Sequence, residues 1–253
     1  MAGTMTTVDA RGLHYRDLNQ RLLELVRQGQ RHLRVENVLG QRYIGTGLPP
    51  AGLELQGTPG EDLAAFMDGS IIRVFGNVQN AVGNTMNSGR VIVHGSAGDV
   101  LGHSMRGGEI WIRGNAGYRV GIHMKASASS SPAIVVGGTA GDFLGEYMAG
   151  GTLVVLGLGC EGSERLIGNW IGTGMHGGAI FIRGGVQDYR LGRGATRADC
   201  DAADLALLSR QVVLYCEEFG LDPQEVLSAP FAKLTPVTSR PYHRLYASSV
   251  GEL

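Results

Sequence analysis

The feature that most constrains this chain is a glycine that closes a short apolar run and recurs at a nearly fixed interval. Its positions are Gly57, Gly76, Gly95, Gly114, Gly138, Gly157 and Gly184. The steps between them are 19, 19, 19, 24, 19 and 27 residues. A methionine keeps the same register, at Met67, Met86, Met105, Met124 and Met148. Two independent columns in one register indicate a unit of about 19 residues repeated in tandem.

The two long steps exceed the repeat by five and by eight residues, and the other columns place the extra residues at 125–132 and 158–166. Insertions confined to one place in a repeat are loops added to a fixed frame. The loops 125–131 and 160–165 either contact the active site of a partner or are plain surface loops.

Each repeat carries two aliphatic positions, the fourth and the second residue before the closing glycine. The fourth-residue column is Ile72, Val91, Ile110, Ile134, Leu153 and Ile180, and the second-residue column is Val74, Val93, Ile112, Val136, Val155 and Ile182. Apolar residues at period two predict strands with one face turned inward. If like positions stack, a polar file also forms from Asn77, Ser96, Asn115 and Thr139. We therefore predict an all-β fold, a single-stranded right-handed parallel β-helix of about seven rungs.

The open ends of such a column need caps. Residues 1–50 are predicted to form an N-terminal helix and strand cap, residues 51–195 the repeats, and residues 196–253 a C-terminal helix with an extended tail. The C-terminal helix is predicted from apolar residues at helical spacing between Leu205 and Phe219, with Gly220 as its stop.

Composition limits the class of protein. The chain has 253 residues, with 41 glycines but only 8 prolines and 43% hydrophobic residues, which excludes both collagen and a disordered chain. A net charge of −1 provides no global field for nucleic acid or an anionic membrane. No apolar run reaches the length of a membrane span, and the first residues lack a secretory signal, so we expect a cytoplasmic protein.

Motifs that suggest chemistry are weak. The cysteines Cys160, Cys200 and Cys216 show no zinc-ligand spacing. Residues 157–162 and 172–177 match GxGxxG, but both lead to another short strand rather than to a helix. Four histidines occupy different columns and are not expected to converge: His94, His103, His123 and His176. No catalytic residues, cofactor site or metal site are predicted on this chain.

The outward face of the principal strand is apolar in five of six repeats, in the series Arg73, Ile92, Trp111, Val135, Val154 and Phe181. An apolar stripe of this kind is covered either by a partner or by the chain's own C-terminal helix. Large aromatic and arginine side chains dominate interface energies. The interface candidates are therefore Trp111, Phe181, Tyr242, Arg244 and Tyr246.

The repeat Gly-x6-Gly-x2-Met-x2-Gly-x5-Gly, as in Gly76, Gly83, Met86, Gly89 and Gly95, resembles the GXGXG domain that ends the large subunit of glutamate synthase. The resemblance covers roughly residues 35–195. A similar domain forms a free-standing subunit of N-methylglutamate synthase-type complexes. More distantly, one of the subunits of formylmethanofuran dehydrogenase and of the related formyltransferase/hydrolase complex is similar too. Segments 217–222, 231–234 and 239–242 look most like the N-methylglutamate synthase type.

The resemblance implies a non-catalytic scaffold in a hetero-oligomer, placed between a class II glutamine amidotransferase-like subunit and an FMN-binding glutamate synthase-like subunit. FMN and an iron–sulfur cluster are then expected on the partner subunits, because this chain lacks an N-terminal nucleophilic cysteine, a flavin barrel and clustered cysteines. Two alternatives remain. One is a scaffold for one-carbon chemistry of the formylmethanofuran dehydrogenase type, and the other is a free-standing enzyme.

Overall fold

The computed structural model describes residues 5–160 and 166–239, and segments 1–4, 161–165 and 240–253 lie outside the described residues. The strands are β1 (Thr6–Asp9), β2 (His32–Leu39), β3 (Gly52–Thr58), β4 (Ile71–Phe75), β5 (Arg90–Val93), β6 (Glu109–Ile112), β7 (Ala133–Val136), β8 (Ala149–Val155), β9 (Gly177–Arg183), β10 (Ala195–Ala198) and β11 (Phe231–Pro236). The helices are α1 (Tyr15–Arg27), α2 (Ala202–Phe219), α3 (Pro223–Leu227) and a 3₁₀ turn at Asp188–Arg190.

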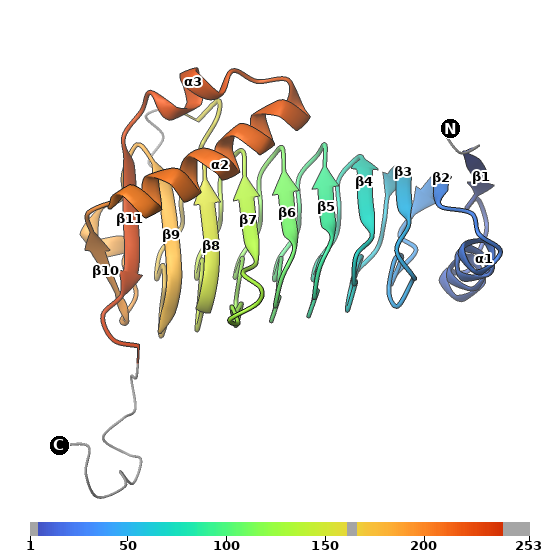
Figure 1. The fold of residues 1–253 in the computed structure, drawn as a ribbon, viewed down its shortest axis with the longest axis horizontal. Coiled ribbons are helices and arrows are strands. Elements are labelled where there is room, and N and C mark those ends of the chain that lie inside the picture. Colours follow the sequence, from blue (N-terminus) through green and yellow to red (C-terminus); the bar gives the residue numbers. More distant parts are fainter. Residues whose placement is uncertain (1–4, 161–165, 240–253) are drawn as a thin grey trace, which may run out of the picture.

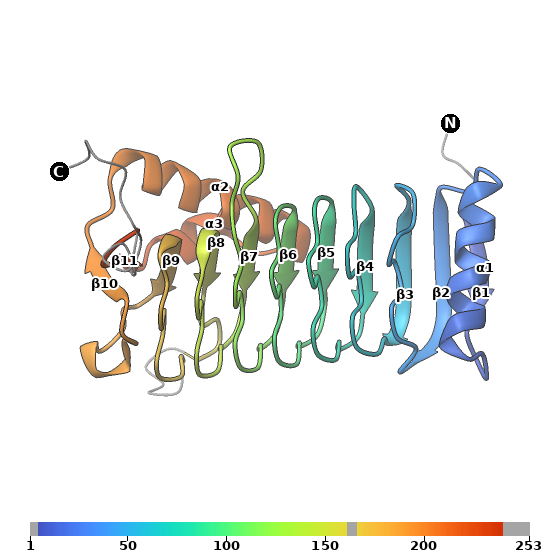
Figure 2. The same ribbon diagram turned by 90° about the horizontal axis from the view of Figure 1, so that it is seen from below.

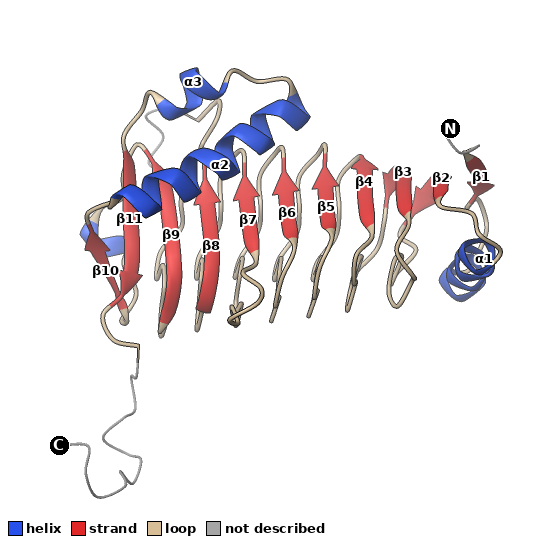
Figure 3. Cartoon of the chain, in the orientation of Figure 1, coloured by secondary structure: helices blue, strands red, loops and turns tan. Residues whose placement is uncertain are grey.

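All eleven strands belong to one sheet with the order β1-β2-β3-β4-β5-β6-β7-β8-β9-β11-β10 (Figures 1 and 3). Neighbours from β1 to β9 are parallel, whereas β11 runs antiparallel to both β9 and β10. The loops that join successive strands stand side by side along the sheet (Figure 2).

The predicted fold class, an all-β parallel β-helix of about seven rungs with helical caps, was wrong. The chain forms one mixed, mostly parallel sheet of eleven strands with three α-helices, an α/β-type arrangement. The glycine repeats account only for β3 to β9, because the flanking segments add β1 and β2 at one edge and β10 and β11 at the other. Outside these strands, each repeat forms turns and isolated bridges such as Val78↔Ala97 rather than further regular strands.

The register of the repeats was predicted correctly. The fourth-residue column pairs in order, for example Ile72 with Val91 and Val91 with Ile110, and all six of its residues are buried. The methionines of the second column are fully buried as well. Stacking identical positions at the ~4.8 Å strand spacing produces this continuous apolar core.

The predicted polar file also forms. The Asn77 side-chain oxygen accepts from the Ser96 backbone N–H at 2.8 Å, and the Ser96 hydroxyl accepts from the Asn115 N–H at 3.1 Å. The Asn115 oxygen accepts in turn from the Thr139 N–H at 2.9 Å. Each short polar side chain thereby satisfies a backbone donor of the next repeat, which stabilises the turn after each strand.

The C-terminal helix α2 begins with a capping box between Asp201 and Asp204 and ends at Gly220, whose φ of 67° is left-handed. This confirms the predicted stop. The helix lies across the outer face of the sheet, from β11 toward β6, rather than over the end of the strands (Figure 1). It therefore buries part of the sheet surface that the sequence marked as apolar.

Candidate functional site

The apolar stripe is covered by the chain itself. Trp111 and Phe181 are 1% and 0% exposed, in a cluster with the α2 residues Leu208, Val212 and Tyr215. Of the two coverings considered from the sequence, the structure contains the chain's own helix. Neither aromatic residue presents a surface to a partner in this arrangement, and Tyr242, Arg244 and Tyr246 lie outside the described residues.

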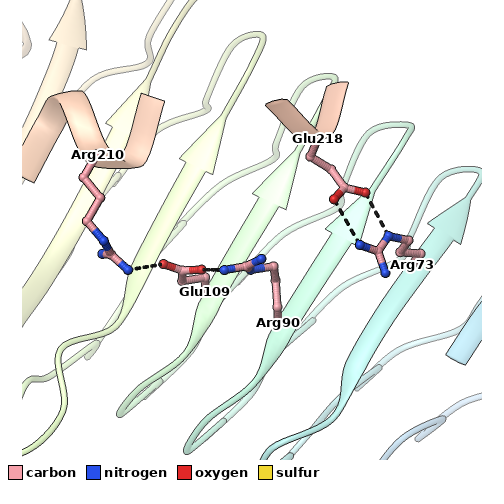
Figure 4. A network of polar contacts seen from close by, with 5 residues as sticks. All are labelled: Arg73, Arg90, Glu109, Arg210 and Glu218. Atoms are coloured by element: carbon pink, nitrogen blue, oxygen red, sulfur yellow. Dashed lines mark hydrogen bonds and ion pairs between the residues drawn. The ribbon is translucent and has the colours of Figure 1, made fainter. Parts of the chain in front are cut away.

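Polar contacts hold α2 in place at both sides of this apolar cluster (Figure 4). The Arg73 guanidinium of β4 donates to both carboxylate oxygens of Glu218 on α2, at 2.8 and 3.1 Å. This contact raises the pKa of Arg73. Farther along the helix, Glu109 of β6 accepts from Arg90 of β5 and from Arg210 of α2, the latter at 3.5 Å. The same Arg90 stacks over the Trp111 ring at 4.1 Å, which explains the burial of a cation beside this indole.

A different group of side chains projects from the turns between strands, and we call it the turn patch. It consists of Tyr118, Arg119, His123, Phe143, Tyr147 and Trp170. All but Tyr118 have a left-handed backbone, with φ values of 56° for Arg119, 55° for His123, 61° for Phe143, 52° for Tyr147 and 57° for Trp170. Bulky side chains rarely adopt this conformation, which costs about 1–3 kcal/mol per residue and is common at functional sites.

The backbone of the next repeat holds these turns in their strained conformation. The N–H groups of Arg119 and Phe143 donate to carbonyls of the following repeat at 2.9 Å, and that of Tyr147 does so at 2.8 Å. Each left-handed residue thus points its donor along the stack, where an acceptor is available. The ordinary conformation would lose these hydrogen bonds.

The side chains of the turn patch pack on one another and remain open to solvent. Trp170 stacks on Phe143 with ring centroids 5.0 Å apart, and the Arg119 guanidinium lies 4.8 Å from the Phe143 centroid. His123 stacks on Tyr147 at 5.3 Å. Trp170 is 52% exposed and Tyr147 is 41% exposed. Arginine and exposed aromatic rings held in fixed positions are the composition of a protein interface.

The sequence analysis did not identify this patch because it followed only the strand columns. A column of glycines in the turns provides the missing signal, at Gly102, Gly121, Gly145 and Gly172. Two residues before these glycines stand Val100, Arg119, Phe143 and Trp170. Two residues after them stand Ser104, His123, Tyr147 and Gly174. The large side chains are therefore confined to the later repeats of the turn edge.

The histidines are partly brought together. The prediction that they do not converge was wrong for His103 and His123, whose ring centroids are 6.0 Å apart. Burial and then the neighbouring His123 lower the pKa of His103. His94 instead stacks on Phe75, and burial lowers its pKa also. Among residues 5–160 and 166–239, no group of three or more side chains is arranged to hold a metal ion.

A cavity of ≈ 680 Å³ lies between α2 and the β10–β11 pair, with Cys200 and Lys233 in its wall. Burial, followed by the nearby Asp204 carboxylate, raises the pKa of the Cys200 thiol. The Lys233 ammonium is bound to Asp204. A protonated thiol beside a neutralised lysine is not an activated nucleophile, so this cavity lacks the features of a catalytic site.

The second GxGxxG match, at residues 172–177, leads into β9 rather than into a helix. It therefore lacks the helix N-terminus that a dinucleotide-binding motif requires. The first match extends into residues outside the described part. No helix in the described part of the chain is long and apolar enough to cross a membrane.

Comparison with known proteins agrees with the repeat pattern. The family described as the GXGXG motif matches residues 26–228, and the chain belongs to this family, which resembles the C-terminal part of the glutamate synthase large subunit. The chain is also 43% identical over 249 residues to the uncharacterized protein MJ1350 of Methanocaldococcus jannaschii. That alignment covers 94% of this chain and 95% of the relative.

Proposed function

We propose that this chain is a non-catalytic scaffold subunit of a glutamate synthase-like complex. In this complex it binds a class II glutamine amidotransferase-like subunit and an FMN-binding synthase-like subunit, which together transfer ammonia or an amine to a 2-oxo acid. FMN and an iron–sulfur cluster belong to the partner subunits in this proposal. Membership of the GXGXG family supports the type of complex.

The observation that carries the scaffold role is the turn patch. It presents exposed aromatic rings and an arginine on a backbone whose strain is offset by hydrogen bonds from the next repeat. Surfaces of this kind bind protein partners, because rigid aromatic side chains lose little conformational entropy on binding. The five members from Arg119 to Trp170 belong to three consecutive repeats, so a single partner surface contacts them together.

The test is affinity purification of the tagged full chain from its native cell, with mass spectrometry of co-eluting chains and a flavin absorbance spectrum of the eluate. We expect an amidotransferase-like chain and a yellow flavoprotein. Recovery of a strictly monomeric, colourless chain would contradict the proposal. A metal-dependent amidohydrolase-type partner would contradict it too, and would assign the scaffold to one-carbon chemistry.

The role of the turn patch is tested with Trp170→Ala in the same purification. Loss of an interface anchor costs about 2 kcal/mol or more, which corresponds to a roughly thirtyfold weaker complex. The matched control is Tyr189→Ala, which removes an aromatic side chain that is 73% exposed outside the patch. Equal recovery of partners with both variants, each verified as folded by circular dichroism, would remove the turn patch from the interface.

A further inference from the structure

A pair of cations occupies one column of the repeats, near the bend that follows the buried methionines. The backbone N–H groups of Asn87, Arg106 and Lys125 donate to methionine carbonyls of the preceding repeat at 2.9, 2.8 and 3.0 Å. The three residues therefore lie one above another on consecutive repeats, at the ~4.8 Å spacing of neighbouring strands. Arg106 and Lys125 are direct neighbours, and both are exposed.

Neither cation has a carboxylate partner in the part of the chain that the structure describes. Other arginines of the repeats are paired with acids, such as Arg90 with Glu109 and Arg119 with Glu146. The acid nearest to this pair along the column is Asp68, two repeats before Arg106, and it accepts a hydrogen bond from the Ser88 hydroxyl. Like charges on directly neighbouring strands repel each other. An anion bound between them would remove this repulsion.

The first inserted loop supplies the rest of a binding site. It folds back on itself through a bridge in which the Ser127 N–H donates to the Ser130 carbonyl at 2.8 Å. Two glycines give it space, because a Cβ on Gly107 would collide with the Ser130 hydroxyl, and a Cβ on Gly150 would lie 2.5 Å from the Ala126 nitrogen. A cavity of ≈ 330 Å³ results, lined by Asn87, Arg106, Lys125, Ala126, Ser127 and Ser130.

We propose that this cavity binds a small oxyanion, a carboxylate or a phosphate group. Its lining offers a guanidinium, an ammonium, a side-chain amide and two hydroxyls, which are the donors that bind such groups. The cavity size is at the lower end for small-molecule sites and fits a compact ligand. With a net charge of −1, the chain as a whole attracts anions no more than cations, so binding here depends on this local pair. The site goes beyond the proposed scaffold role and does not overlap the turn patch.

The experiment is isothermal titration of the purified full chain with inorganic phosphate and, separately, with succinate, at constant ionic strength. We expect saturable binding of one probe per chain. A preference for phosphate identifies a phosphate-bearing ligand, and a preference for succinate identifies a carboxylate. Lys125→Gln and Arg106→Gln each remove one charge-assisted contact and weaken binding about tenfold. The control Arg193→Gln, at an exposed arginine outside the cavity, leaves binding unchanged.

A charge-neutral variant tests the geometry. Gly150→Ala displaces the inserted loop through its contact with the Ala126 backbone and is expected to weaken binding while Arg106 and Lys125 remain. The proposal is overturned if neither probe binds the wild-type chain, or if Arg193→Gln lowers affinity as much as Lys125→Gln. Titration of the isolated chain does not depend on partners, so this result is separate from the purification that tests the complex.

Discussion

Tyr215 and Cys216 place two weakly acidic groups next to each other on the buried side of α2. The Tyr215 hydroxyl donates to the Ile112 carbonyl at 3.2 Å, and both residues are 0% exposed. Burial raises the pKa of both groups, that of the Cys216 thiol to about 11. The cause is the same in each case, because an apolar environment disfavours the charged form. At the residue scale, the cover of the apolar stripe therefore requires these groups to be neutral.

This requirement predicts a loss of stability at alkaline pH. Between pH 9 and pH 11 the unfolded chain releases the Cys216 proton while the folded chain retains it, so the free energy of unfolding falls as pH rises. Tyr215 adds to the decline above pH 10, the ordinary pKa of a tyrosine. Urea unfolding across this range measures the slope. Cys216→Ala removes the thiol and makes the slope between pH 9 and pH 11 shallower, and an unchanged slope would assign the decline to other groups.

At the scale of the element, α2 is held by packing together with the ion pair between Arg73 and Glu218. We expect Glu218→Gln to lower the free energy of unfolding by about 1 kcal/mol, since the contact is bidentate but partly solvated. The matched control is Asp188→Asn, which weakens the pair with Arg197, where the acid is 82% exposed. That change should be close to neutral. Equal effects of the two variants in urea unfolding would show that the tether contributes no more than a surface pair.

The strands of the repeats could be predicted because glycine spacing and aliphatic alternation follow directly from backbone geometry. The strand at His32–Leu39 and the stop of α2 at Gly220 were also readable from local patterns. The edge strands β1, β10 and β11 were not, because they pair with residues far away or beyond the repeats. The turn patch was missed for a different reason. Its left-handed backbone is imposed by hydrogen bonds between repeats, and side chains such as Phe143 carry no local signal for that conformation.

At the scale of the whole molecule, the chain separates its stable parts from its exposed ones. The outer sheet face beneath α2 is closed by the chain itself, whereas the turn edge and the inserted loop remain open. One apolar cluster runs from Val8 in β1 to Leu234 in β11 and includes residues of every strand from β1 to β9. A scaffold of this kind holds two distant surfaces at a fixed separation, because neighbouring repeats share the same core.

This shared core predicts a single cooperative unfolding transition that one central substitution disrupts along the whole chain. Ile112 is 0% exposed near the middle of the sheet, and Ile112→Asp buries an unpaired charge at a cost of about 3–5 kcal/mol. The control Asn115→Asp adds the same charge three residues later at an exposed position and keeps a side-chain oxygen as acceptor for Thr139. Hydrogen exchange should show lost protection from β2 to β9 in Ile112→Asp but not in Asn115→Asp. Loss confined to β5, β6 and β7 would instead show that the repeats unfold separately, and a rigid separation of two binding surfaces would then need another source.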